Sequence, residues 1–163
     1  MPATRDDLFA RFAELGIETT TKDHDPVYTV EEARALRGEI SGGHCKNLFL
    51  KDKKGVLWLV VTLEDAQVDL KALPKKIGSG RLSFGKGELL IEVLGIEPGS
   101  VTPFSLINDT EQKVQVVLDA DMMAHDVLNF HPLKNDATTS VSSQDLLKFV
   151  EACGHAPQIV AVV

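Results

Sequence analysis

Three short stretches of this chain carry residue types that could act on an anionic or oxyanionic group. Lys46 and Asn47 are neighbours within an apolar stretch of extended character, where a lysine either reaches solvent at a sheet edge or waits for an anion. The loop Gly99–Pro103 has the spacing G-x-x-x-P, and a glycine-bearing loop can present main-chain amides to an oxyanion. His131 ends an extended stretch directly before a proline. Each signal also has a structural interpretation, as a solvated lysine, a turn or a hydrogen-bonded histidine.

Two familiar catalytic signatures are incomplete. Residues 80–86 have the spacing of a phosphate-binding loop, but Gly87 follows where a Ser or Thr hydroxyl should bind magnesium, and no buried strand precedes the stretch. This argues against nucleotide hydrolysis.

Zinc sites need ligands at paired close spacings, which His24, His44, His125, His131, Cys45 and Cys153 do not show. We therefore expect no metal and no cofactor. Cys45 as a nucleophile would need a base brought near by the fold, and cysteine is otherwise a small buried hydrophobe.

The elements that must position these residues mix helices and strands without a regular βαβ repeat, which predicts an α+β fold with a mixed sheet. No repeat or linker divides the chain, so residues 1–163 are expected to form a single domain. The predicted helices are 5–15 between Thr4 and Gly16, 29–38 behind a capping box at Thr29–Glu32, 69–77 interrupted by Pro74, 88–94 before Gly95, and a last one from Ser142 or Ser143 to Gly154. The predicted strands or extended pieces are 17–22, 45–50, 56–62, 81–84, 104–107, 114–118, 127–130, 138–141 and 158–162.

The hairpin 45–50/56–62 is the clearest of these predictions. Its second strand is a continuous Val/Leu/Trp run, which indicates a strand buried on both faces near the middle of a sheet. In its first strand, alternation places Cys45 and Asn47 on one face and Lys46 and Leu48 on the other. The side chains of Lys46 and Asn47 therefore point apart unless the ladder contains a bulge.

Charge is distributed unevenly along the chain. The formal net charge is −7, but residues 46–86 carry nine Lys and Arg against four Asp and Glu, which is +5 and leaves −12 for the rest. This asymmetry suits a protein that meets phosphates on one side, although solvated faces would look the same. The apolar runs are far shorter than the roughly 20 residues that span a bilayer. The N-terminus lacks a basic stretch leading into an apolar one, and with two cysteines a cytoplasmic location is expected.

Several of these stretches, taken in order, resemble the YbaK/ProX family, the freestanding relatives of the editing domain inserted in bacterial prolyl-tRNA synthetase. The resemblance covers nearly the whole chain. The stretches that carry it are Gly42–Leu50, Leu57–Val61, Ser83–Gly85, Gly99–Phe104 and Asn129–Pro132, of which Lys46-Asn47 and the G-x-x-x-P loop are the most specific. The resemblance implies a mixed, partly barrel-like sheet flanked by helices, and hydrolysis of a mischarged aminoacyl-tRNA ester.

The resemblance also implies roles for particular residues. Lys46 would hold a phosphate or ribose oxygen of the terminal adenosine, and Asn47 would be a polar positioning residue. Amides around Gly99 would face the ester carbonyl or the attacking water, and His131 would contact the aminoacyl group or water. The flanking positions expected to bind substrate are Gly43, His44, Ser100, Val101, Thr102 and Pro103. Because an aminoacyl ester is already activated, a positioned water and oxyanion stabilisation suffice, with no metal and no covalent nucleophile.

The resemblance is strongest to the branch that deacylates alanyl-tRNA(Pro). The synthetase cannot exclude alanine by binding alone, because a smaller side chain fits its larger pocket, whereas a second, smaller pocket would admit alanine and reject proline by size. Cysteinyl-tRNA(Pro) is the rival substrate, because cysteine is only slightly larger.

The alternative from another class is a noncatalytic nucleic-acid-binding module. The expected partners are the acceptor end of tRNA(Pro) and prolyl-tRNA synthetase, with no membrane and no specific duplex DNA binding, since the acidic remainder of the chain disfavours it.

Overall fold

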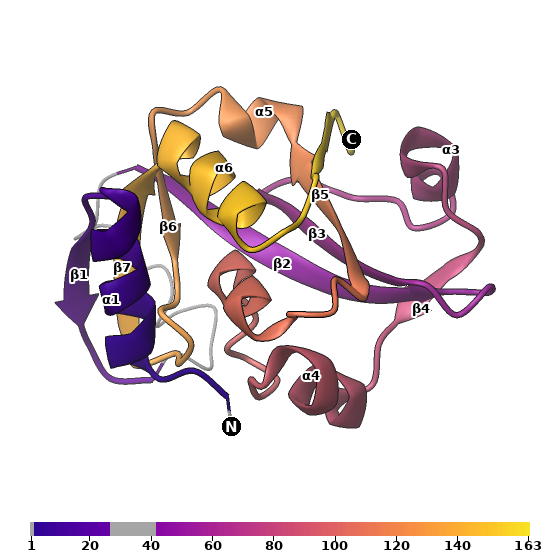
Figure 1. The fold of residues 1–163 in the computed structure, drawn as a ribbon. Coiled ribbons are helices and arrows are strands. Elements are labelled where there is room, and N and C mark those ends of the chain that lie inside the picture. Colours follow the sequence, from indigo (N-terminus) through magenta and orange to yellow (C-terminus); the bar gives the residue numbers. More distant parts are fainter. Residues whose placement is uncertain (1, 27–41) are drawn as a thin grey trace.

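The computed structural model describes residues 2–26 and 42–163 (Figure 1). Its helices are α1 (Arg5–Leu15), α3 (Leu73–Ile77), α4 (Gly87–Leu94), α5 (Ala120–Met123) and α6 (Ser143–Ala152), with a 3-10 helix η1 at Pro103–Asn108. Its strands are β1 (Thr20–Asp23), β2 (Gly43–Asp52), β3 (Leu57–Leu63), β4 (Leu82–Phe84), β5 (Val114–Asp119), β6 (Val127–Phe130), β7 (Ala137–Ser142) and β8 (Gln158–Val160). The capping box and helix predicted at 29–38 lie outside the described residues.

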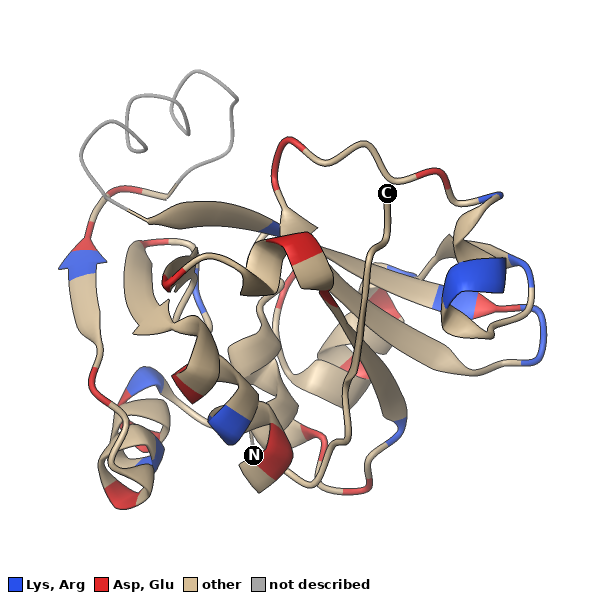
Figure 2. Cartoon of the chain, turned by 90° about the horizontal axis from the view of Figure 1, so that it is seen from above, with Lys and Arg blue, Asp and Glu red and all other residues tan. Residues whose placement is uncertain are grey.

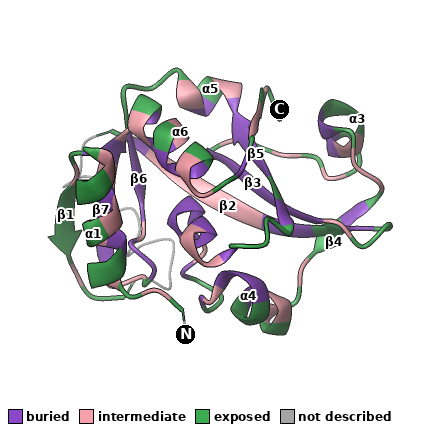
Figure 3. Cartoon of the chain, viewed as in Figure 1, coloured by how far each residue is buried: buried purple, intermediate pink, exposed green. Residues whose placement is uncertain are grey.

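Within the described part of the chain, eight strands form one mixed sheet in the order β1-β7-β6-β2-β3-β5-β8, with β4 paired to β2. β2 and β3 form the predicted hairpin, while β2 pairs in parallel with β6, β3 with β5, and β5 with β8. β3 lies between β2 and β5 and is buried along nearly its whole length, as its apolar run predicts (Figure 3). The predicted α+β class with a mixed sheet flanked by helices is confirmed.

The two faces of the sheet carry different cores. Helices α1, α4, η1 and α6 lie over one face and pack into the larger apolar cluster, which also takes Phe49 and Leu59 from β2 and β3 (Figure 1). Helix α3 covers the other face, where Leu50 and Trp58 belong to a smaller cluster. Neighbouring residues of β2 therefore face different cores, which is the alternation of an unbulged strand. None of the helices in the described ranges is long and apolar enough to cross a membrane.

One predicted strand, 104–107, is wrong, because this stretch is the 3-10 helix η1. Thr102 caps the helix by accepting a hydrogen bond from the amide of Phe104, and Pro103 starts it with a fixed φ that suits a first turn. The ring of Phe104 is fully buried and packs edge-on against Phe12, Phe130 and Phe149, with centroid distances of 5.1–5.6 Å. The tail of the Gly99–Pro103 loop is thus anchored in the core.

Other differences concern where elements begin. The first strand starts at Thr20 rather than at Ile17, because Ile17 belongs to the core that α1 covers. Pro74 does not interrupt a long helix but lies in the first turn of the short helix α3, where proline is tolerated. α5 was not predicted, and its four residues are capped by Asp119. The predicted caps Thr4, Gly16, Gly95 and Ser142 are confirmed.

A buried carboxylate organises the β2–β3 turn. Asp52 is 5% exposed and accepts hydrogen bonds from the amides of Lys54 and Val56, the indole of Trp58 and the amide of Gly80. Burial raises the pKa of Asp52, but these hydrogen bonds outweigh it and hold the pKa below the usual value. The turn and the segment before β4 are therefore joined through one side chain.

Replacing this carboxylate should cost stability. Asp52→Asn places an NH2 group among donors and removes a charged acceptor, so we expect the free energy of unfolding to fall by about 2–4 kcal/mol. Urea denaturation followed by circular dichroism measures the loss. Asp69→Asn, which changes an exposed carboxylate that, among the described residues, accepts from the amide of Lys71 alone, is the matched control and should cost less than about 1 kcal/mol. Equal losses in the two variants would contradict this role of Asp52.

Candidate functional site

The candidate site forms where two parallel strands separate. β2 and β6 pair only at Gly43 with Leu128 and at His44 with Asn129. Lys46 and His131 each lie two residues beyond the last of these pairs, so they flank the point of separation. Asn47 follows on β2, and its Nδ2 donates a 3.0 Å hydrogen bond to the carbonyl of Val101. The fold thus brings β2, the end of β6 and the Gly99–Pro103 loop together.

Asn47 holds an acceptor that nothing in the described part of the chain uses. Its Nδ2 is fixed by Val101, while its Oδ1 is buried without a hydrogen-bond partner. A buried, unpaired carbonyl oxygen costs about 1–3 kcal/mol, and native proteins pair most such groups. The Oδ1 atom is therefore poised to accept a hydrogen bond from a ligand N–H or O–H.

The Gly99–Pro103 loop supplies unused donors beside this acceptor. Gly99 is exposed and has φ +91°, a left-handed conformation in which other residues are strained. The amides of Gly99 and Val101 donate no hydrogen bond to any described residue, whereas the amide of Ser100 donates to the carbonyl of Glu97 at 3.0 Å. Ser100, Thr102 and Pro103 are buried. The loop is rigid at its C-terminal end and leaves two main-chain donors available.

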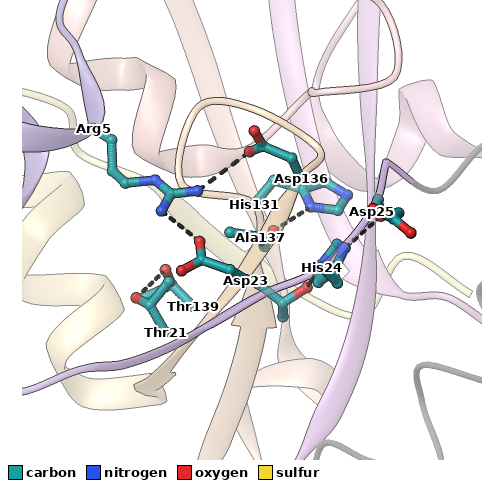
Figure 4. Close-up of polar contacts among 10 residues, drawn as sticks. Arg5, Thr21, Asp23, His24, Asp25, His131, Asp136, Ala137 and Thr139 are labelled. Carbon is teal, nitrogen blue, oxygen red and sulfur yellow. Dashed lines mark hydrogen bonds and ion pairs between the residues drawn. The ribbon is translucent and has the colours of Figure 1, made fainter.

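His131 is held in one orientation with one nitrogen left over. Its Nδ1 lies 3.0 Å from the carbonyl of Ala137, so in the neutral ring this nitrogen carries the hydrogen and donates it (Figure 4). Partial burial and the neighbouring His24 lower the pKa of His131, against opposing effects of the Ala137 hydrogen bond and of Asp136. The ring is therefore neutral at pH 7, with an unprotonated Nε2 that accepts a hydrogen bond. No described residue binds Nε2.

The structure also brings in His24, which the sequence indicated only as the end of a strand and as an unpaired metal-ligand candidate. Its ring centroid is 6.4 Å from that of His131, at an interplanar angle of 61° (Figure 4). Its Nδ1 lies 2.7 Å from the carbonyl of Asp25 and its Nε2 lies 2.8 Å from the hydroxyl of Thr138. This pairing depends on β1 joining β7, and no local pattern signals that contact.

The side chain of Lys46 lies on the opposite face of β2 from that of Asn47. The β2–β3 register runs without a bulge from Cys45 opposite Leu63 to Lys51 opposite Leu57, so the predicted alternation holds. The Lys46 ammonium donates to the carbonyl of Ala66. Ala66 lines a hollow of about 700 Å³ with Gly43 and His44, together with acidic Glu64, Asp65, Asp119 and Asp121. Lys46 with its partner Ala66 therefore lies on one face of β2, and Asn47 with the Gly99–Pro103 loop lies on the other.

Known proteins that resemble this chain identify its family. Residues 24–149 match the family model described as the aminoacyl-tRNA editing domain. The chain is a member of the aminoacyl-tRNA editing domain family. The prolyl-tRNA editing protein ProX of Acetoanaerobium sticklandii is 41% identical over 149 residues, covering 91% of each chain. Prolyl-tRNA synthetase associated domain-containing protein 1 of Mus musculus is 40% identical over 161 residues, covering 96% of this chain and 95% of the relative.

The fold of the editing domain also matches solved structures. A crystal structure of a candidate trans-editing enzyme for prolyl tRNA synthetase superposes with a TM-score of 0.72 at 18% identity, covering 99% of this chain and 98% of that one. At this identity the likeness establishes the fold. The family predicted from the motifs is confirmed by the sequence relatives.

Thiol chemistry does not fit this editing domain. Burial raises the pKa of Cys45 to about 12 and that of Cys153 to about 11, so neither forms a thiolate near neutral pH. Cys45 packs against the larger core, as the alternative interpretation expected. Among residues 2–26 and 42–163, no three His, Cys, Asp or Glu side chains form a group that could hold a metal ion.

A basic cleft adjoins the site of the editing domain. It has a volume of about 830 Å³ and lies between the β2–β3 turn, β4 and α4. Figure 2 shows Lys and Arg gathered at this end of the molecule, around the hairpin tip and α3. The cleft is lined by Lys51, Lys53, Arg81 and Lys86, by acidic Asp52, Glu88 and Glu92, and by Phe84, whose side chain is 65% exposed.

Two close contacts join the cleft to the site. Gly85 lies so near the Phe49 ring that a Cβ there would come within 2.5 Å of it, and Phe49 is two residues along β2 from Asn47 on the same face. A Cβ on Gly87 would lie 3.1 Å from Pro98, which precedes Gly99. The segment 85–87 beside the cleft therefore packs against the segments that carry Asn47 and Gly99.

Proposed function

We propose that this editing domain hydrolyses the ester that links alanine to tRNA(Pro), acting in trans to the synthetase that forms it. The observation that carries the proposal is the buried, unpaired Oδ1 of Asn47 beside a loop with unused amides. An aminoacyl ester presents a donor and an acceptor a few ångströms apart, namely its α-ammonium and its carbonyl oxygen. The site offers the complementary pair, with a neutral imidazole from His131 nearby in the fold.

In the proposed reaction the Asn47 Oδ1 accepts a hydrogen bond from the α-ammonium group and fixes the aminoacyl end. The amides of Gly99 and Val101 donate to the carbonyl oxygen, where negative charge develops as water attacks the carbonyl carbon. The Nε2 of His131 accepts a hydrogen bond from that water and orients it. The bond between the carbonyl carbon and the ribose oxygen then breaks, and a proton from water passes to the ribose oxygen.

Lys46 fits a ribose oxygen better than a phosphate. The hollow that its ammonium contact borders has an acidic lining, which repels a phosphate group. An ammonium has three donors, and among the described residues only Ala66 accepts from this one. We propose that a ribose hydroxyl takes one of the others at the point where β2 and β6 separate, next to the ester that the same ribose carries.

The basic cleft is the proposed path of the acceptor end beyond the terminal nucleoside. Lys53 and Arg81 would contact phosphates and exposed Phe84 would stack on an unpaired base. We expect Lys53→Ala to raise KM for Ala-tRNA(Pro) and to reduce the slope of log affinity against log salt by about 0.7–0.9, one phosphate contact, as measured by salt titration of tRNA binding. Lys148→Ala on α6, which changes an exposed lysine away from the cleft, is the control. Equal slopes for both variants would contradict this path.

Hydrolysis itself tests the function. Ala-tRNA(Pro) carrying labelled alanine is incubated with the protein in buffer containing EDTA, and the release of free alanine is followed. The proposal expects release above the spontaneous rate and independent of chelation. Binding of the tRNA without release of alanine would overturn it and favour a noncatalytic binding module.

A further inference from the structure

Arg5 lies at the N-terminal end of a helix, where a positive charge is unfavourable. It is the first residue of α1, behind the Thr4 cap, at the end where the helix dipole is positive. The two residues after it, Asp6 and Asp7, have the charge that suits this end, and Asp7 completes the capping box. A residue that opposes the local preference points to a contact made elsewhere in the fold.

That contact is a bridge between two segments that carry histidines. The Arg5 guanidinium lies 2.6 Å from a carboxylate oxygen of Asp23 and 3.2 Å from one of Asp136 (Figure 4). Asp23 directly precedes His24. Asp136 directly precedes Ala137, whose carbonyl accepts the hydrogen bond from His131. One side chain on α1 thus binds the residue before His24 and the residue before Ala137, which is the hydrogen-bond partner of His131.

The bridge supports these segments because the strand that joins them is an exposed edge strand. β1 is an edge strand of four residues, all exposed, and its pairing with β7 ends at Asp23 opposite Ala137. Beyond that pair, the amide of His24 donates to the carbonyl of Asp136 at 2.9 Å. The histidines therefore lie just beyond the end of the ladder of an exposed edge strand, where contacts from outside the ladder help to hold their order.

We propose that Arg5 is a positioning residue for His131, which it orients by tying Asp23 and Asp136 together at the end of the β1–β7 ladder. Arg5 acts through the Ala137 carbonyl and through the placement of His24, and it does not touch the substrate. This inference rests on the proposed function of His131.

Arg5 also affects the pKa of His131, through the charged groups around the ring. The charged or titratable groups near the ring are His24 and Asp25 on the β1 side, Asp136 on the β7 side, and Arg5 with Asp23 behind them. Asp136 favours the protonated ring, and the guanidinium of Arg5 compensates that carboxylate. Removing Arg5 should therefore raise the pKa of His131 and reduce the neutral fraction of the ring near pH 6.

Arg5→Gln tests the inference, with Arg11→Gln as the matched control. Arg11 lies on the same helix and also makes one ion pair, with Glu14, and one hydrogen bond, to the carbonyl of Ala152, but it is not bonded to either histidine segment. We expect Arg5→Gln to lower kcat for Ala-tRNA(Pro) about tenfold with KM unchanged within twofold, since a small displacement of a catalytic group costs rate rather than binding. Arg5→Lys, which keeps the charge but cannot bridge two carboxylates in the same way, should recover only part of kcat.

A readout independent of activity separates this inference from the function. Imidazole nitrogen NMR of the full chain, titrated from pH 5 to 8, reports the tautomer and the pKa of His131. In Arg5→Gln we expect the pKa to rise by about 0.5 and the preference for a hydrogen on Nδ1 to weaken, with neither change in Arg11→Gln. An unchanged tautomer and titration in Arg5→Gln would overturn the role of Arg5 whether or not the wild-type protein deacylates. Failure of the wild-type protein to deacylate, with these NMR changes present, would instead count against the proposed function alone.

Discussion

His131→Ala is expected to lower kcat for Ala-tRNA(Pro) hydrolysis by about 10²–10⁴-fold, because it removes the basic nitrogen that is proposed to orient the attacking water and that no described residue binds. Single-turnover deacylation measures the loss without interference from product release. His131→Asn is the companion variant, since its amide can still donate to the Ala137 carbonyl but offers no basic nitrogen. If His131→Asn retained the wild-type rate, His131 would be only a structural residue.

Protonation of His131 is expected to determine how the deacylation rate depends on pH. Burial and His24 lower the pKa of His131 below its usual value of 6.5, so the active neutral ring persists as the pH falls through 6.5. The rate should stay level down to about pH 6.5 and decline only below it, where Nε2 takes up a proton. A decline centred above pH 6.5 in the wild-type protein would contradict the assignment, and His131→Asn should lack this limb of the profile.

Asn47→Leu should separate activity from stability. Loss of a hydrogen bond between Oδ1 and a charged ammonium is worth about 1.5–3 kcal/mol, which corresponds to a 10–150-fold fall in kcat/KM. The unpaired oxygen of Asn47 meanwhile destabilises the free protein, and its removal offsets the loss of the Nδ2 hydrogen bond to Val101, so an apolar side chain of similar size should change the free energy of unfolding by less than about 1 kcal/mol. Deacylation kinetics and urea denaturation of the same preparation measure both.

A modified substrate provides the control for Asn47. N-acetyl-alanyl-tRNA(Pro) has no α-ammonium group, so wild-type protein and Asn47→Leu should hydrolyse it at similar rates. A large difference between the two proteins on this substrate would show that Asn47 acts on something other than the ammonium group.

Local signals predicted much of the fold correctly. Thr4 with Gly16, and Ser142 with the apolar spacing after it, marked two helices, and the Val/Leu/Trp run marked the central strand. Residues 104–107 were predicted as a strand because their apolar character outweighed the signal of Thr102-Pro103 before them, a cap followed by a proline that starts a helical turn. Boundaries set by packing, such as that of Ile17, depend on contacts that no local pattern shows.

The sequence predicted individual residues of the candidate site but not how the fold brings them together. Period-two alternation correctly placed the side chains of Lys46 and Asn47 on opposite faces, because the β2–β3 ladder has no bulge. The neighbourhood of His24 and His131, and the bridge from Arg5, depend on the register of β1 against β7 across more than a hundred residues of chain. Only the folded structure shows which acceptor and which donors are left without a partner.

The most direct test of the account is the hydrolysis of four esters, alanyl, cysteinyl, seryl and prolyl, on the same tRNA(Pro), by the wild-type protein. We expect alanine to be released fastest and proline to stay attached, because the proposed pocket admits a small side chain and rejects the larger pyrrolidine ring. Release of proline at a rate comparable to that of alanine would contradict it, as would release of cysteine alone.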